Sequence, residues 1–72
     1  MQSLTEMPDN AICTIKWMLG LPEEMDQALR SWEIHPGSEI RVIQNNGDGL
    51  MIIGSGARRI AMNAETTDHI RV

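Results

Sequence analysis

Few side chains in this sequence could bind a metal ion or act as a strong nucleophile. They are one cysteine, Cys13, and two histidines, His35 and His69. Thiolate and imidazole groups are common ligands of zinc and iron, and tight sites bring three or four ligands together. No two of these residues have a ligand spacing such as C-x-x-C or H-x-x-x-H. The sequence therefore predicts no tight metal site and leaves only His35 and His69 as weak candidate ligands.

Motifs for catalysis are also missing. Nucleophilic catalysis needs a base beside the nucleophile and donors for the developing charge. The serines lie in no such motif, and Cys13 stands among alternating apolar residues, which favours a buried and unreactive thiol. The glycine-rich stretches 46–49 and 54–56 lack the spacing of a phosphate-binding loop, and no lysine follows them. We therefore predict no catalytic residues, no cofactor-binding residues and a protein that is not an enzyme.

Composition and charge exclude several classes of partner. The net charge of −4 and the single adjacent basic pair, Arg58 and Arg59, argue against nucleic acid binding. The chain has only two Trp and no Phe or Tyr, so it offers few stacking platforms for bases. Its longest apolar run, 50–53, is far shorter than the ~20 residues that span a bilayer. One cysteine and an N-terminus without basic residues favour a cytoplasmic protein without direct membrane insertion.

The first half of the chain reads as a strand followed by a helix. Residues 11–18 alternate, which predicts a strand with Ala11, Cys13, Ile15 and Trp17 on its apolar face. Gly20 ends the strand, and Pro22 with several carboxylates marks the start of a helix. An apolar stripe follows at helical spacing, formed by Met25, Leu29 and Trp32. Asp26 and Arg30 can pair on this helix at i, i+4.

The second half reads as short strands separated by turns. His35-Pro36-Gly37-Ser38 has the type II pattern, because Gly accepts the positive φ at the third position. A strand is predicted over 39–45, with Ile40 and Val42 on one face, and 46–49 is a hairpin turn. The remaining predicted elements are a strand at 50–53, a tight turn at 54–56, a strand at 58–62, a helical turn at 63–68 and a strand at 69–72.

This order of elements predicts a mainly β protein. Five short strands with one helix between the first two are typical of a small β-barrel, here one domain over residues 1–72. Closure would protect strand edges that an open sheet of this size would expose. The helix is expected to cap one open end with Met25, Leu29 and Trp32.

The arrangement resembles the FeoA family over residues 4–72. The resemblance rests on Gly20, the helix with Leu29 and Trp32, Ile34-His35-Pro36-Gly37, the I-x-V at 40–42, the Gly-Asp-Gly turn, and the R-I-A-M…I-R-V ending. It implies an SH3-like β-barrel of about five strands with one α-helical insertion. It also implies an accessory protein of bacterial ferrous iron uptake that works with the membrane transporter FeoB.

Two positions depart from the family pattern. The family usually has Gly before the residue that matches Ile34, where this chain has Glu33. A left-handed Glu costs about 1 kcal/mol, which favours a different helix end. The family also tends to have a basic residue on the helix near position 28, where this chain has the apolar Ala28.

These observations lead to one functional prediction and one alternative. We predict that the protein binds and modulates the cytoplasmic part of FeoB, at the inner face of the membrane. Leu19, Gly20, Leu21 and Met25 are the predicted contact residues. No cofactor is required, and homo-oligomerisation and a weakly bound divalent transition metal stay open. The alternative is a metal-responsive regulatory domain that binds Fe²⁺ or another divalent transition metal.

Overall fold

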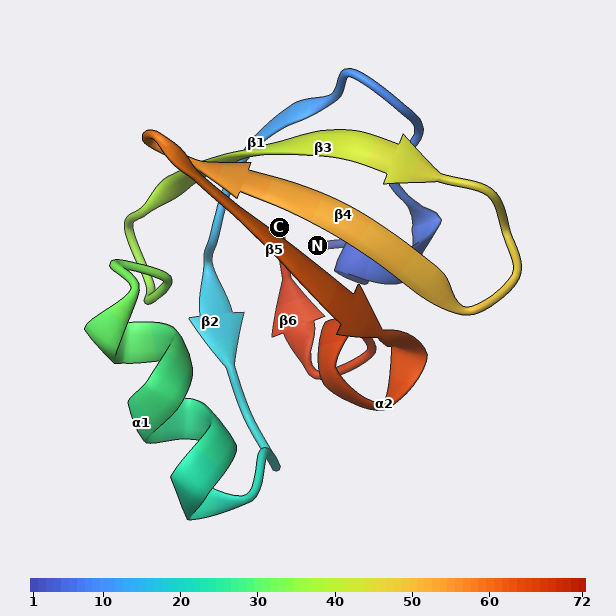
Figure 1. Cartoon of the computed structure of the whole chain (residues 1–72). Helices are drawn as coiled ribbons and strands as arrows, with labels where there is room; N and C mark the ends of the chain where they lie inside the picture. The colour runs from blue at the N-terminus through green and yellow to red at the C-terminus, as the bar shows by residue number, and fades with distance from the viewer.

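The fold consists of two antiparallel sheets with one helix beside them. A computed structural model describes all residues, 1–72 (Figure 1). The elements in chain order are a 3₁₀ turn η1 (Leu4–Glu6), β1 (Ile12–Thr14), β2 (Trp17–Met18), α1 (Glu23–Ser31), β3 (Glu39–Asn45), β4 (Leu50–Ser55), β5 (Arg58–Asn63), α2 (Ala64–Thr67) and β6 (Ile70–Arg71). Neither helix is long and apolar enough to cross a membrane.

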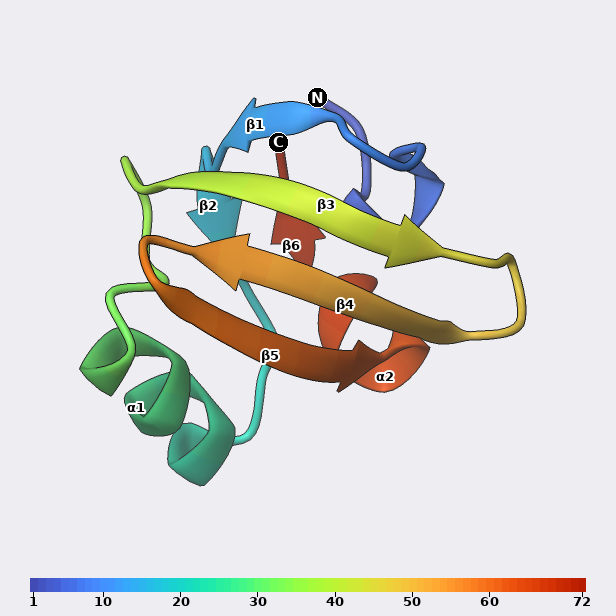
Figure 2. The same ribbon diagram turned by 45° about the horizontal axis from the view of Figure 1, so that its top comes forward.

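Strand pairing confirms a mainly β domain and shows how far the sheet closes. One sheet has the order β1-β3-β4-β5, and the other pairs β2 with β6 (Figure 2). Both sheets are antiparallel throughout. No hydrogen-bonded ladder joins β5 to β2 or β6, so the pairing does not form one closed cylinder. The outer strands β1 and β5 therefore remain edges of the larger sheet.

The core lies between the two sheets and α1. It contains eleven buried apolar side chains, among them Leu4, Ile15, Leu29 and Ile53. Met18, Met51 and Met62 take part in this cluster, where a chain with Phe or Tyr would place rings. Leu29 is fully buried, whereas Trp32 packs at the border of the core and Met25 is 39% exposed. The predicted helical stripe thus covers the core mainly through Leu29.

The predicted strand at 11–18 is wrong in one respect, because it divides into two strands. Ile15 leaves the larger sheet, donating its N–H to Ser38 O at 2.9 Å, and Lys16 then donates to Arg71 O in the smaller sheet at 2.8 Å. The chain crosses between sheets there, which breaks the two-residue alternation. Met18 consequently points into the core and Trp17 points outward, contrary to the prediction for Trp17.

Of two turns predicted from glycine and proline, the structure confirms one and places the other differently. The turn at His35-Pro36-Gly37-Ser38 is confirmed, with Ser38 N–H donating to His35 O at 3.0 Å and Gly37 at a φ of 94°. The predicted turn at 54–56 is wrong, since β4 continues to Ser55 and the chain reverses at 56–57. Gly54 sits inside the strand, where Ile43 packs against the space that a side chain would fill.

The end of α1 uses a left-handed glutamate, against the expectation from sequence. Glu33 has a φ of 63°. Its N–H donates to Arg30 O at 3.1 Å, and the N–H of the fully buried Ile34 donates to Leu29 O at 2.9 Å, which is the Schellman pattern. Ser38 Oγ–H adds a bond to Glu33 O at 2.7 Å. Burial of Ile34 and these bonds together hold Glu33 in a conformation that glycine would adopt without strain.

The N-terminal segment closes the molecule at a place the sequence reading left unassigned. Leu4 is fully buried, and Thr5 Oγ1 lies 2.7 Å from Thr67 Oγ1 and donates to Asp68 Oδ1 at 2.6 Å. Gln2 exchanges two backbone hydrogen bonds with Val72. Both chain ends are thus fixed against each other.

Replacing Glu33 by glycine is expected to raise the free energy of unfolding by roughly 0.5–1 kcal/mol. Glycine avoids the ~1–2 kcal/mol strain of a left-handed residue. Part of this stabilisation is lost, because glycine also increases the conformational entropy of the unfolded chain. Thermal and urea unfolding followed by circular dichroism would measure the change, which corresponds to about 2–8 °C in Tm for a domain of this size.

Glu24 provides the matched control for this substitution. It is also an exposed glutamate, but it lies in the first turn of α1. Glu24→Gly is expected to lower the free energy of unfolding by roughly 0.5–1 kcal/mol, because glycine is a poor helix former and the substitution removes a carboxylate from the positive end of the helix dipole. Equal destabilisation by the two glycine variants would contradict our account of the helix end.

Candidate docking surface

The loop between β2 and α1 presents a group of apolar side chains to solvent. Leu19 is 58% exposed, and its neighbours Trp17 and Met25 are 40% and 39% exposed. Leu21, in the same loop, is half-buried and packs against the core. We call the surface formed by Trp17, Leu19, Leu21 and Met25 the docking surface. Trp17 and Leu19 line one shallow groove with His69, and Leu21 and Met25 line a second groove with the same histidine, whereas the other exposed large apolar residues are dispersed.

Those other residues provide a useful comparison. Met1, Ile12 and Leu50 are also exposed, but they lie at the N-terminus, in β1 and at the start of β4. Single apolar residues on a surface are ordinary, whereas a cluster is a common feature of interaction sites. The docking surface is therefore the stronger candidate for binding a partner.

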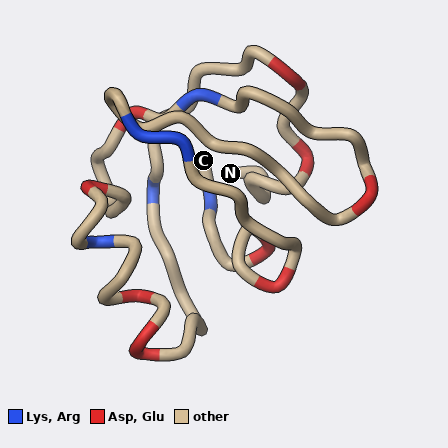
Figure 3. The backbone as a smooth tube through the Cα atoms, in the orientation of Figure 1, with Lys and Arg blue, Asp and Glu red and all other residues tan.

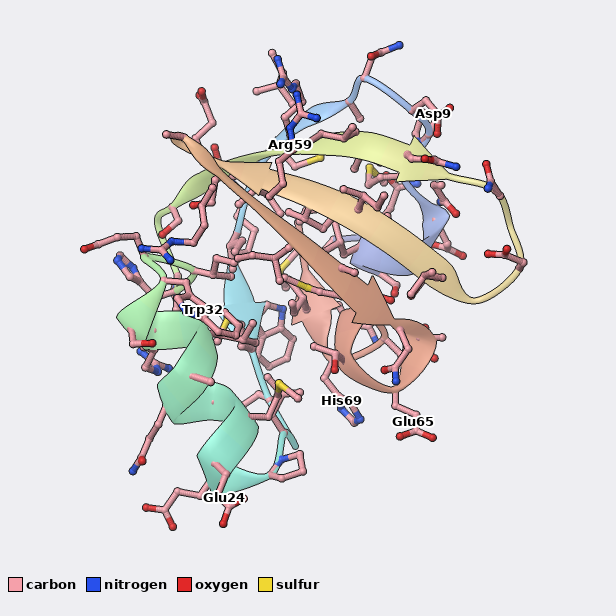
Figure 4. The ribbon with its side chains drawn as sticks, in the orientation of Figure 1. Asp9, Glu24, Trp32, Arg59, Glu65 and His69 are labelled. Atoms are coloured by element: carbon pink, nitrogen blue, oxygen red, sulfur yellow. The ribbon has the colours of Figure 1, made fainter.

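His69 holds the loop of the docking surface in place. The Leu19 N–H donates to His69 O at 3.2 Å, and the ring Nδ1 of His69 lies 2.9 Å from Leu19 O. Since a carbonyl oxygen only accepts, Nδ1 must carry the hydrogen. Figure 4 places His69 at the lower edge of the molecule. The prediction of a solvated histidine is thus correct for exposure but missed this pair of bonds across 50 residues of sequence.

Gly20 packs directly on the ring of His69. Its φ is 80°, in the region that favours glycine, and a Cβ built on it would lie 3.0 Å from His69 Nδ1. A larger residue would therefore suffer both backbone strain and a close contact. The sequence reading identified Gly20 as a strand breaker, and the structure gives it the further role of fitting the loop against His69.

Carboxylates border the docking surface on the α1 and α2 sides, and Arg71 borders it beside Trp17. The N-terminal turn of α1 carries Glu23 and Glu24, and the segment at α2 carries Glu65 and Asp68 (Figure 3). A groove of about 340 Å³ runs between these elements, bordered by Leu21, Met25, Glu65 and His69 among others. Its mixed walls suit a protein segment with an apolar side chain and basic neighbours better than a small molecule.

The candidate metal ligands are not gathered into one site. No group of three His, Cys, Asp or Glu side chains could hold a metal ion. His35 lies beside Glu33, with Nε2 and Oε2 3.6 Å apart, whereas His69 is bonded to Leu19. Cys13 is half-buried, and burial raises the pKa of its thiol, which keeps it protonated and unreactive. Metal binding through His35 or His69 stays a prediction.

The predicted contact residues divide between two grooves that meet at His69. Gly20, Leu21 and Met25 border one groove and Leu19 lines the other, and their use in binding stays a prediction. That reading missed Trp17 and His69, which line a second shallow groove of about 220 Å³ with Leu19. Strict alternation assigned Trp17 to the core, and no sequence pattern links His69 to a loop 50 residues away.

Comparisons with known proteins agree on one family. A family model described as the FeoA domain matches residues 2–72. A search of the curated proteins gave no match. The structure is similar to a crystal structure of an iron uptake regulatory protein (FeoA), with a TM-score of 0.81 and 25% identity. That similarity covers 94% of this chain and 88% of the other.

A second solved structure supports the same fold. It is the solution structure of iron(II) transport protein A from Clostridium thermocellum, with a TM-score of 0.81 and 24% identity. The similarity covers 97% of this chain and 43% of that one. Since the family model spans nearly every residue, the chain belongs to the FeoA family, a family of non-enzymatic accessory proteins of ferrous iron transport.

Proposed function

We propose that this protein binds the cytoplasmic part of the ferrous iron transporter FeoB through the docking surface and modulates iron uptake. Membership of the FeoA family supports a role in the ferrous iron transport system. The absence of any cluster of three metal-ligating side chains favours an interaction module over a tight metal sensor.

One observation carries the proposal more than any other. Leu19 is an exposed apolar side chain on a loop whose backbone is fixed from both sides by His69. A fixed apolar side chain can bind with little loss of conformational entropy, which is how anchor residues achieve large effects. Full burial of a leucine side chain contributes about 1.5–3 kcal/mol. The carboxylates on the α1 and α2 side of the docking surface would favour a partner that carries Lys or Arg on that side.

Replacing Leu19 by aspartate is expected to weaken binding to purified FeoB from the same organism at least tenfold. The charge would be buried without a partner, and the apolar contact would be lost. Biolayer interferometry on detergent-solubilised transporter would measure the Kd, with the Tm of the variant expected to stay near that of the parent. Leu19 suits this test better than Leu21, because Leu21 packs against the core.

Ile12→Asp is the matched control. Ile12 is 68% exposed, lies in the edge strand β1 and lines neither groove of the docking surface. It should bind FeoB like the parent chain. Equal loss of binding in the two variants, or normal binding by Leu19→Asp, would remove the docking surface from the account.

The fit of Gly20 against His69 gives a second prediction. Gly20→Ala is expected to lower the Tm by more than about 4 °C and to weaken FeoB binding, because strain and the contact with His69 both displace the loop. Gly49→Ala separates the two causes, since Gly49 also has a positive φ of 92° but nothing within 4 Å of a built Cβ. It should show only the backbone strain and keep normal binding. Identical behaviour of the two variants in both assays would show that His69 does not constrain the loop.

A further inference from the structure

The backbone of β5 is unpaired along one side. This strand forms an edge of the four-stranded sheet, with β4 as its only paired neighbour. A two-residue turn, Gly56-Ala57, joins the strands, with Ser55 opposite Arg58. Gly56 has a φ of 60°, which suits the first central position of a type II′ turn. In such a turn the fourth residue donates its N–H to the first, so the main chain of Arg58 faces β4.

The next residues follow from the alternation of an antiparallel ladder. Main-chain groups point in turn toward the partner strand and away from it. Counting from Arg58, those of Ile60 and Met62 face β4, and those of Arg59 and Ala61 face outward. No backbone hydrogen bond outside the ladders involves Arg59 or Ala61, and both residues are exposed. Two N–H donors and two C=O acceptors therefore stand free along this edge.

A groove lies beside this edge. Its walls are α1, through Leu29 and Trp32, and β5, through Ile60 and Ala61, and its volume is about 170 Å³. Past Trp32 the hollow continues as a wider space of about 490 Å³ that reaches Arg58. Figure 4 shows Trp32 between α1 and the sheet. The groove therefore has an apolar section beside the free backbone and an end that Arg58 and Glu33 both border.

The start of β5 carries two adjacent arginines, and their side chains point to opposite faces of the sheet. Arg58 and Arg59 form no ion pair, since the pairs present are Arg30 with Asp26 and His35 with Glu33. Figure 3 shows the two arginines as a continuous basic segment at the start of β5. Uncompensated guanidinium groups favour carboxylates, with which they make charge-assisted hydrogen bonds.

We propose that the β5 edge takes up an extended peptide segment of a partner protein as an added strand. The segment carries acidic side chains beside Arg58 and Arg59 and apolar side chains over the groove at Trp32. A peptide fits because alternating donors and acceptors require a partner with both, which phosphate groups lack. A second copy of β5 offers no carboxylate, since its sequence is RRIAMN. Met25 borders both this groove and the docking surface, whereas Leu19 does not line this groove, so the proposal does not depend on FeoB binding at Leu19.

Hydrogen exchange tests the strand pairing directly. The probes are two hexapeptides with blocked ends. One has two glutamates followed by alternating valine and threonine, and the other has the same residues in reverse order. Each is added to the full chain labelled with ¹⁵N. The amides of Arg59 and Ala61 should exchange at least tenfold more slowly with one of the orders at saturation. Unchanged exchange with both peptides, or slowing confined to other residues, would overturn the proposal.

Two variants separate backbone pairing from charge. Ala61→Pro removes an outward N–H and no ladder bond, which edge strands tolerate, and should abolish binding. Arg59→Glu should weaken binding at least fivefold and recover it with lysines in place of the glutamates. Arg41→Glu is the matched control, because Arg41 and Arg59 both pair with Gly54 but Arg41 lies two strands from the edge. Its charge is screened at that distance, so binding should change less than twofold.

The remaining outcomes are equally decisive. Leu19→Asp should bind the peptide normally, which distinguishes this edge from the docking surface. Equal effects of Arg59→Glu and Arg41→Glu would reduce the binding to general charge attraction and overturn the proposal. A third outcome would assign the edge to self-association and overturn the proposal. In that case the amides of Arg59 and Ala61 would exchange more slowly at higher protein concentration without any peptide, and sedimentation velocity would show dimers.

Discussion

The hydrogen bonds between Leu19 and His69 determine how this small domain can present a surface. They join residues 50 apart in sequence and fix the loop after β2 against the segment before β6. Short loops with exposed apolar side chains are otherwise mobile, and ordering them on binding costs free energy. In this protein the loop is already ordered in the folded chain. Gly20 fits against the ring of His69, and movement of the loop would break both hydrogen bonds between Leu19 and His69.

The rest of the fold supplies that constraint with a rigid base. Eleven buried apolar side chains form the core, and three of them are methionines. The crossing of the chain at Ile15 and Lys16 links the two sheets, and the N-terminal segment bonds to Thr67 and Asp68 at α2. Each tie is modest, yet together they fix β6 and therefore His69. A chain without large rings thus achieves a defined surface through hydrogen bonds between distant segments.

Much of the fold could be predicted because local chemistry dictates it. The strand over 39–45, the Pro36–Gly37 turn and the short helical turn near the end follow from periodicity and turn residues, and the structure confirms them. The FeoA family and the absence of enzymatic function are confirmed as well. The division of strand 11–18 could not be predicted, since its cause is pairing of Lys16 with a strand at the far end of the sequence.

The site shows the same limit. The exposed loop at Leu19 and Gly20 could be predicted because a glycine break before a helix start marks a surface loop, whereas its use as a contact surface stays a prediction. Trp17 was assigned to the wrong face, since alternation continued through a crossing that only the tertiary structure reveals. Glu33 was expected to change the helix end, yet burial of Ile34 and two backbone bonds outweigh about 1 kcal/mol of strain.

The most direct test of a preformed docking loop is hydrogen–deuterium exchange of the whole protein with and without FeoB in lipid nanodiscs. Our account predicts that peptides covering residues 17–25 become protected in the complex. It also predicts that the amide of Leu19, which is bonded to His69, is already protected in the free chain. Protection of other surfaces while residues 17–25 exchange as in the free protein would contradict the account.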